Sequence, residues 1–355
     1  MTTSPFDHPF LSGLMGDTEL ARHLSAEADI AAMVAFEIAL AQAEADEGLI
    51  PRDAAEAITT AAQLFEPDFA SLNRATAKDG VVVPELVRQL RIKVGEPHAE
   101  HVHFGATSQD VIDTSLAMRL RPVLSVLVSR LAMTADALVA LSKRDGNVIV
   151  MAHTRMQAAI PVPASRKIAS WRQPLTRHQD RLNQAREAAQ VLTFGGAVGT
   201  LDKLGAKARP VTERLAAHLD LCVSDPARHS ERDGMAALAS VLSLITGSLG
   251  KMGADLVLAA QTEVGEVRLA SGGGSSSMAH KINPVGAETL VTLARFNATV
   301  LGGMHQALVH ENERSGSAWT LEWMLLPQML VATGASLRTA IDLIAHLSFA
   351  SQVKP

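Results

Sequence analysis

Residues 110–138 read DVIDTSLAMRLRPVLSVLVSRLAMTADAL, and this stretch decides the class of fold. Apolar side chains recur in it every three or four residues, which is the spacing of one face of an α-helix. The run predicts a helix of about eight turns from Asp110, with a kink at Pro122. The face in question is Leu116, Leu120, Leu124, Leu127, Leu131, Ala135 and Leu138, and the opposite face is also apolar, at Val123, Val128 and Val139. A helix that is apolar on both sides is expected to pack on several sides.

The same period continues along most of the chain. A second face runs through Leu238, Leu242, Ile245, Leu249, Met252 and Leu256. Strand alternation is almost absent, so the sequence predicts an all-α fold with a compact helical domain over residues 1–110 and a bundle of long helices over residues 111–355. Other helices are expected over roughly 17–48, 160–192, 285–312 and 320–347, and shorter ones after Pro51, Pro67 and Pro84, since proline is tolerated in a first turn.

Composition excludes several classes of protein. Apolar residues make up 47% of the chain and charged residues 19%, which indicates a folded chain with enough apolar surface to form an oligomer. The 32 basic and 37 acidic residues give a net charge of −5, which argues against nucleic acid as a partner. The single cysteine, Cys222, excludes an internal disulfide and a cysteine-rich metal site. The longest uncharged run, residues 234–250, is short for a membrane span, and residues 1–10 lack the features of a signal peptide, so a cytoplasmic location is expected.

Residues 101–114 (HVHFGATSQDVIDT) place two hydroxyl groups at the start of the first long helix. Thr107 and Ser108, together with the free backbone N–H groups of a helix start, would make an anion site. The alternative is simple capping by Thr107 or Ser108, with Asp110 favoured by the helix dipole. His101 and His103 could bind a metal, but two histidines without a nearby third ligand are more typical of a polar network, so no metal is expected.

Two further polar segments interrupt the apolar pattern. Residues 152–157 (AHTRMQ) place His153, Arg155 and Gln157 before an apolar helix. The alternative interpretation is a capped helix start with a surface arginine. Residues 311–323 (ENERSGSAWTLEW) hold Arg314 and two tryptophans in a charged break between apolar helices. An ordinary turn with solvated charges is the alternative there.

Residues 274–284 (GSSSMAHKINP) form the sharpest candidate. A flexible Gly/Ser linker is the alternative, but a linker need not carry Lys281 and Asn283 in a fixed run. A loop that closes over a ligand and brings Ser275 near a cation fits better, because a serine beside an ammonium and backbone N–H groups ionises more easily. The small-residue turn at residues 194–200 (FGGAVGT) lacks the spacing of a dinucleotide loop, so no nucleotide cofactor is expected.

Together these segments resemble the fumarase/aspartase superfamily, which includes argininosuccinate lyase, adenylosuccinate lyase and 3-carboxy-cis,cis-muconate lactonizing enzyme. Residues 274–284 resemble the signature G-S-S-x-M-P-x-K-x-N-P, and residues 101–114 resemble the run H-x-G-x-T-S-x-D-x-x-D-T. Residues 195–199 look like the glycine turn of these enzymes, and residues 311–323 look most like the bacterial 3-carboxymuconate cycloisomerases.

The resemblance implies three helical domains, a homotetramer, and active sites that draw on three subunits. The chain stops where the third domain would begin, so that domain is expected to be absent. Ser275, on a mobile loop near 268–284, matches the serine that moves a proton to or from carbon. Lys281 and Asn283 match substrate-binding residues, and Thr107 and Ser108 match the hydroxyls that hold a substrate carboxylate.

Two departures from the superfamily pattern matter. Ala279 stands at the signature proline, and Arg155 stands where lyases with G-R-T-H-x-Q have a histidine, with His153 in the place of the arginine. Expelled water or amine needs a proton from an acid, whereas a carboxylate, with a pKa near 4, needs none. A guanidinium can orient a carboxylate with two hydrogen bonds. Arg155 therefore favours intramolecular addition of a carboxylate.

The predicted activity is a cofactor-independent cycloisomerase that converts 3-carboxy-cis,cis-muconate, a small tricarboxylate, to a lactone in aromatic catabolism. Arg155 and Arg314 are expected at the substrate carboxylates, and His153, Gln157 and His103 complete the substrate-binding set. Three alternatives stay open: a C–N lyase of the adenylosuccinate type, a sulfomuconate cycloisomerase, and a catalytically silent helical scaffold.

Overall fold

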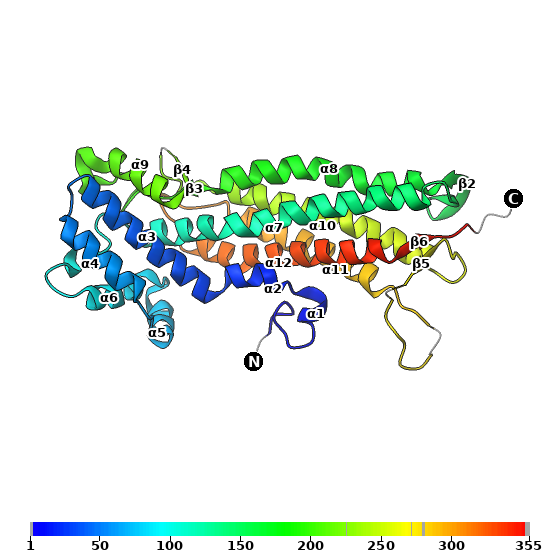
Figure 1. Cartoon of the computed structure of the whole chain (residues 1–355), viewed down its shortest axis with the longest axis horizontal. Coiled ribbons are helices and arrows are strands. Elements are labelled where there is room, and N and C mark those ends of the chain that lie inside the picture. Colours follow the sequence, from blue (N-terminus) through cyan, green and yellow to red (C-terminus); the bar gives the residue numbers. More distant parts are fainter. Residues whose placement is uncertain (1–2, 225, 271, 279–280, 352–355) are drawn as a thin grey trace.

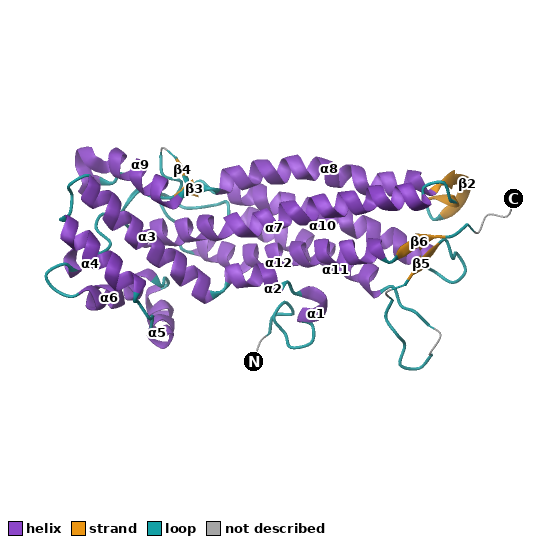
Figure 2. Cartoon of the chain, viewed as in Figure 1, coloured by secondary structure: helices purple, strands orange, loops and turns teal. Residues whose placement is uncertain are grey.

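The structure, a computed structural model, describes residues 3–224, 226–270, 272–278 and 281–351. It is an elongated bundle of long helices with a group of shorter helices at one end (Figure 1). Strands are short and lie towards the two ends of the bundle (Figure 2). The predicted all-α fold is confirmed.

The bundle consists of long helices that pack along one another. Contacts join α10 to α11, α7 to α8, α11 to α12, α8 to α10 and α7 to α12. The longest, α7, has 38 residues and is therefore roughly 57 Å long. The bounds are α7 (Ser108–Asp145), α8 (Ala164–Ala189), α10 (Asp233–Ala259), α11 (Val285–Gln306) and α12 (Ser317–Ala345).

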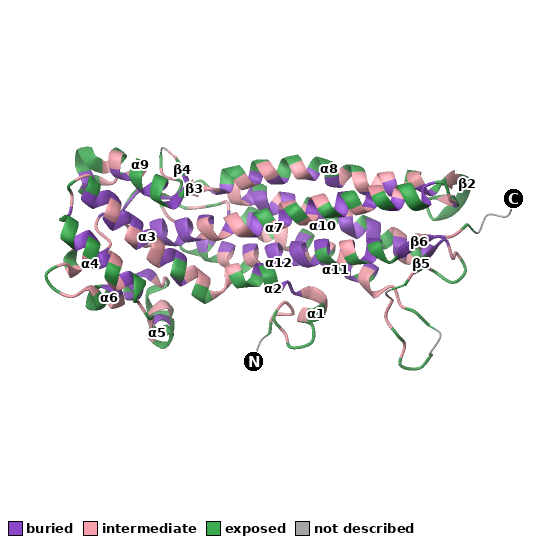
Figure 3. Ribbon diagram, viewed as in Figure 1, coloured by how far each residue is buried: buried purple, intermediate pink, exposed green. Residues whose placement is uncertain are grey.

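The apolar faces predicted for α7 and α10 form the centre of the bundle (Figure 3). From Leu120 to Leu138 the α7 series is buried, whereas Leu116 is only half-buried, and the α10 series from Leu238 to Leu256 is buried throughout. By length and composition alone α7 and α10 could cross a bilayer, but here their apolar faces lie inside the bundle.

The opening helix predicted over 17–48 is wrong as one element. Asp17 caps only the short helix α2 (Thr18–Ala21), by accepting from Leu20 N at 3.1 Å. Ser25 then caps α3 (Ala26–Asp46), by accepting from Ala28 N at 3.2 Å, so this second cap divides the run. The helices expected at the three prolines are confirmed as α4 (Arg52–Gln63), α5 (Phe69–Asp79) and α6 (Val83–Val94). The chain begins with another short helix, α1 (Ser12–Met15).

A second apolar core lies at the end of the bundle where α3 to α6 gather. The start of α7 enters it, and so does α9 (Ala208–Leu219), from a much later part of the chain. Two short strands, β3 (Val191–Leu192) before α9 and β4 (Cys222–Val223) after it, pair with each other in parallel. We call this the first-core end. The domain boundary at residue 110 stays a prediction.

The opposite end carries a β-hairpin that the sequence interpretation missed. β1 (Ile149–Thr154) pairs antiparallel with β2 (Gln157–Pro163), and the two-residue turn is Arg155 and Met156, with φ of 47° and 67°. Such turns usually contain Asn-Gly, so the turn signal was missing here. β5 (Val267–Leu269) pairs with β6 (Leu347–Phe349) at the same end, which we call the hairpin end (Figure 1).

Candidate functional site

The predicted site residues lie in two groups at opposite ends of the bundle (Figure 1). Thr107, Ser108, His103 and Arg314 lie at the first-core end, beside the start of α7. The hairpin and the loop with Ser275 follow the far ends of α7 and β5. Because α7 is roughly 57 Å long, one chain does not bring Thr107 and Ser275 together.

Thr107 is the N-cap of α7, so the capping interpretation is confirmed. It forms a capping box with Asp110, in which Thr107 N donates to Asp110 Oδ2 at 2.9 Å. Ser108 is the first residue of the helix and is half-buried. Within the described part of the chain its hydroxyl has no hydrogen-bond partner, which leaves it free to bind a ligand at the positive end of the helix dipole.

Asp110 does not compete with such a ligand, because its carboxylate faces inward and is saturated with donors. Besides Thr107 N it accepts from Gly195 N at 2.9 Å, Gly196 N at 3.0 Å and His229 Nε2 at 2.7 Å. A Cβ on Gly195 would lie within 2.9 Å of His229, so the close approach requires glycine. The glycine turn therefore encloses a buried carboxylate.

Arg314 reaches the same place from the segment before α12. Its Nη1 donates to Thr107 Oγ1 at 3.3 Å, its Nε donates to Gln109 Oε1 at 2.9 Å, and its Nη2 donates to the carbonyls of Gly196 and Ala197 at 3.4 and 3.2 Å. These contacts use four of the five N–H groups of a guanidinium. Arg314 thus ties its own segment to the α7 start and to the glycine turn, and among the described residues one of its N–H groups is left for a ligand.

A buried ion network lies one turn further along α7. Arg232 Nη1 is 2.7 Å from Asp113 Oδ2, and Arg232 Nη2 is 2.5 Å from Glu322 Oε2. Trp319 Nε1 donates to Asp113 Oδ1 at 2.9 Å. Burial opposes the charge of Arg232, but the two carboxylates outweigh it and raise the pKa of the guanidinium. Arg232 therefore stays charged and joins α7, α10 and α12 below the site.

The sequence patterns did not single out His229, Arg232, Asp113 or Glu322 as site residues. One signal was present, because Asp113 and Glu322 are acidic residues inside otherwise apolar helical runs. Buried charges of this kind are almost always paired, so each of them calls for a cation elsewhere in the chain. The sequence does not say which of the 32 Lys and Arg residues that cation is.

His103 lies in the loop before Thr107 with a positive φ of 65°. Its Nδ1 is 2.7 Å from Glu37 Oε1 on α3, and both side chains are largely buried. His101 instead faces Glu100, at 3.9 Å. Among the described residues no group of three His, Cys, Asp or Glu side chains could hold a metal ion.

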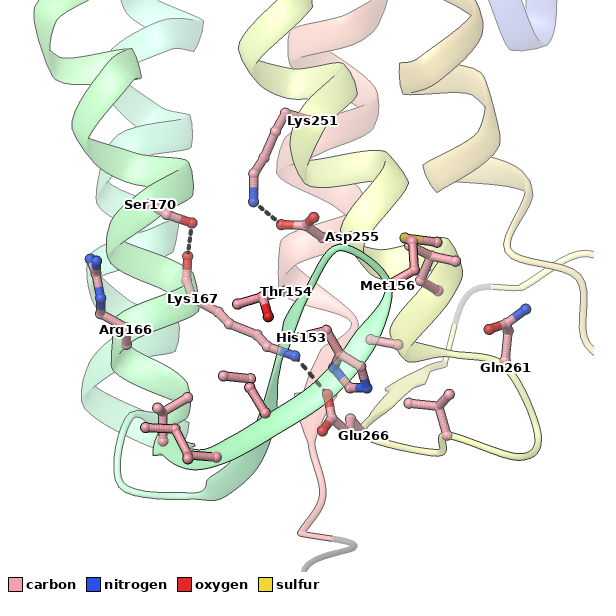
Figure 4. A pocket seen from close by; sticks show the side chains of 17 residues that line it. His153, Thr154, Met156, Arg166, Lys167, Ser170, Lys251, Asp255, Gln261 and Glu266 are labelled. Carbon is pink, nitrogen blue, oxygen red and sulfur yellow. Dashed lines mark hydrogen bonds and ion pairs between the residues drawn. The ribbon is translucent and has the colours of Figure 1, made fainter.

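At the hairpin end, His153, Arg155 and Gln157 are all exposed on the β1–β2 hairpin. Arg155 is at the tip of the turn, and His153 Nδ1 lies 3.1 Å from Met151 O. A cleft of about 710 Å³ lies between the hairpin, α8 and α10, with His153 on its wall (Figure 4). Its two lysines are already paired, Lys167 with Glu266 at 2.7 Å and Lys251 with Asp255.

The loop between β5 and α11 has a closed stem. Gly273 and Asn283 exchange backbone hydrogen bonds of 2.8 and 2.7 Å, and Asn283 Nδ2 donates to Gly274 O at 3.2 Å. A Cβ on Gly272 would lie 1.9 Å from the Ile282 side chain, so glycine is needed for the two arms to meet. Ser271, Ala279 and His280 lie outside the described residues. The departure from the signature at Ala279 therefore also lies outside them.

Ser275 is at the beginning of the loop tip and is half-buried. Its Oγ accepts from Met278 N at 3.1 Å and from Ser277 N at 3.4 Å. The two backbone N–H donors expected beside Ser275 are thus present, and easier ionisation of its hydroxyl stays a prediction. Lys281 is exposed, and no hydrogen bond joins it to Ser275 within the described residues.

Comparison with known proteins gives consistent matches. The sequence model of a family described as Lyase matches residues 14–299. A 3-carboxy-cis,cis-muconate cycloisomerase of Pseudomonas aeruginosa is 39% identical over 328 residues, which are 90% of this chain and 71% of that protein. One from Pseudomonas putida is 38% identical over 96% of this chain and 81% of that protein.

A solved structure shares the fold as well. The crystal structure of the 3-carboxy-cis,cis-muconate lactonizing enzyme from Pseudomonas putida matches with a TM-score of 0.90 and 37% sequence identity. The match covers 96% of this chain and 77% of that one.

Proposed function

This chain belongs to the lyase family, within the fumarase/aspartase superfamily that its motifs resemble, and on that premise we propose that it is a 3-carboxy-cis,cis-muconate cycloisomerase. One carboxylate of the substrate adds to a double bond of the same molecule and closes a γ-lactone. The reaction breaks one C=C π bond and forms one C–O and one C–H bond. The proton comes from solvent and replaces the one that the attacking carboxyl group carries in the free acid, so the free acids are isomers and no other co-reactant is needed. A cytoplasmic location fits this metabolic role.

The observation that carries the proposal is Arg155 at the exposed tip of the hairpin. At this motif position the superfamily lyases have an acid for a poor leaving group. A fixed guanidinium supplies no proton at neutral pH, but it can hold a carboxylate with two parallel hydrogen bonds. Binding by a guanidinium without proton transfer suits an internal carboxylate, which bonds to carbon as an anion. It suits water or an amine poorly, and so the C–N lyase alternative is not favoured.

We assign the remaining roles by chemistry. As the C–O bond forms, negative charge builds on the α-carbon and spreads into its carboxylate. Lys281, Asn283, Thr107 and Ser108 stabilise that charge as a cation and preorganised donors, while Ser275 delivers the proton to carbon. Arg155, Arg314, His153, Gln157 and His103 hold the other carboxylates.

The site is shared between subunits in this proposal, and the molecule is a homotetramer. Thr107 and Ser275 lie at opposite ends of an elongated chain, so a complete site needs the first-core end of one protomer and the hairpin end of another. Apolar side chains that are exposed on the bundle, such as Met133, Leu244 and Met324, provide surface for that assembly.

Turnover of 3-carboxy-cis,cis-muconate tests the proposal directly. Loss of the conjugated-diene absorbance, with a lactone as the only product by NMR, is the expected result. Release of fumarate from adenylosuccinate or argininosuccinate, without action on the muconate, would instead assign a C–N lyase. Tight binding of these acids without any turnover would indicate a silent scaffold.

Arg155→His tests the leaving-group argument. We expect kcat/KM to fall about 10- to 100-fold, because a bidentate charged contact to the reacting carboxylate is lost. Arg268→His is the matched control: Arg268 is also exposed at the hairpin end, on β5, does not line the cleft that holds His153, and has no proposed role. Steady-state kinetics of both variants decide the matter, and equal activity of the two would refute the role of Arg155.

A further inference from the structure

Two buried carboxyl groups below the site have no role in the mechanism so far. Glu37 and Glu44 lie on one face of α3, two turns apart, and both are essentially inaccessible to solvent. Within the part of the chain that the structure describes, Glu37 Oε2 and both carboxyl oxygens of Glu44 have no hydrogen-bond partner. Buried polar atoms without partners are rare and costly in folded proteins, so three on one helix face call for an explanation.

Both groups lie against the loop that leads into Thr107. Glu37 contacts His103 at 2.7 Å. A Cβ on Gly105 would lie 3.9 Å from Glu44 Oε1, so the second carboxyl group is directly beneath the loop backbone. The loop has positive φ at both His103 and Gly105 and is thus held in a tight, specific conformation over the pair.

The charges of this cluster can be assigned from its surroundings. Burial lowers the pKa of His103, but the charge and hydrogen bond of Glu37 and the charge of Asp110 on α7 outweigh burial and the nearby Arg91 of α6, so the pKa is raised. Burial and then the charge of Glu37 raise the pKa of Glu44 from 4.5 to about 9. Glu44 is therefore neutral at pH 7, and the contact with Glu37 favours the protonated form of His103.

We propose that Glu37 is a positioning residue that keeps His103 cationic and leaves its Nε2–H for a carboxylate of the substrate, while Glu44 stays neutral so that the cluster of Glu37, Glu44 and His103 carries no net charge. The binding half of this inference rests on the proposed function. Ionised Glu44 would place a second negative charge beneath the site. Loss of Glu37 would leave Asp110 to favour the proton of His103, with burial and Arg91 opposing it.

A direct test follows the His103 ring by NMR in the intact protein labelled at histidine Cε1, with His103→Gln to assign its signal. Titration of His103 above the ordinary value of about 6.5 is expected, and titration below it would overturn the inference. In Glu37→Gln the midpoint should drop by about one unit or more. This measurement needs no turnover, so it stands even if the proposed reaction is wrong.

Kinetics of Glu37→Gln then separate positioning from a merely structural role. KM for 3-carboxy-cis,cis-muconate should rise about tenfold at pH 8 and much less at pH 6, with kcat nearly unchanged. The reason is that His103 of the variant loses its proton at a lower pH than His103 of the wild type. Loss of kcat at all pH values with the His103 titration unchanged would refute the positioning role. If Glu37→Gln does not fold, the wild-type titration alone decides.

Glu44→Gln is the matched control, since glutamine has the shape and charge of the protonated acid. The His103 titration and KM at pH 7 should stay as in the wild type. Wild-type stability should decline as the pH rises from 4.5 to about 9, because over that window Glu44 ionises in the unfolded chain and not in the folded one. The variant should lack that decline in chemical denaturation. A His103 shift in Glu44→Gln equal to that in Glu37→Gln would overturn the assignment of charges.

Discussion

Ser275→Ala should lower kcat by about 10²- to 10⁴-fold, which is the usual contribution of a group that transfers a proton in the transition state. Among the described residues, its Oγ accepts from the N–H groups of Ser277 and Met278, and both of these lie in the same loop. The thermal unfolding midpoint and the circular dichroism spectrum should therefore stay unchanged while turnover is lost.

Ser277→Ala supplies the matched control for that loss. Ser277 is exposed, two residues along the same loop, and alanine keeps the backbone N–H that points to Ser275 Oγ. We expect nearly normal kcat for this variant. Solvent-isotope and pre-steady-state measurements would show whether carbon protonation is the step that slows in Ser275→Ala. Near-normal turnover of Ser275→Ala would remove the proton-transfer role.

Two inactive variants should restore activity when they assemble together. Ser108→Glu places an anion at the helix start, where it repels a substrate carboxylate, while a glutamate in the first turn is compatible with the helix dipole. Ser275→Ala disables the opposite end. In a mixed oligomer, a site with the α7 start of a Ser275→Ala chain and the loop of a Ser108→Glu chain is intact.

Random 1:1 assembly should give about a quarter of sites in that intact form. The α7 start and the loop of a site come from different chains, and each has a probability of about one half of being intact. Co-expression with two different affinity tags isolates the hybrids, and light scattering gives their size. Each variant alone, and the two mixed after separate assembly, are the controls. Hybrids that form but stay inactive would show that one protomer supplies both ends of its own site.

The helices of the bundle follow from local pattern, and so they could be predicted. The leucine series of α7 from Leu120 onward and that of α10 are buried as their period indicates, and Thr107 caps α7 as its hydroxyl predicts. The hairpin could not be found in this way, since a turn of Arg155 and Met156 carries none of the usual turn residues.

The interior of the first-core end depends on pairings between distant residues. Asp110 meets His229, 119 residues away, and Arg314 meets Thr107, 207 residues away. Local sequence spacing says nothing about such partners. Glu37 and Glu44 could have been noticed in the sequence, because they are acidic residues within the apolar run of α3. Acidic side chains are rarely buried without a partner, and both of these are buried.

The hairpin turn also limits how this protein can be engineered. Arg155 and Met156 both occupy the left-handed region, at a cost of roughly 1 kcal/mol each for side chains of this kind. A consensus redesign towards thermostability would choose Asn-Gly at this turn and relieve that cost. It would also remove the guanidinium that we propose holds the reacting carboxylate, so at this turn a gain in heat tolerance would come with a loss of activity.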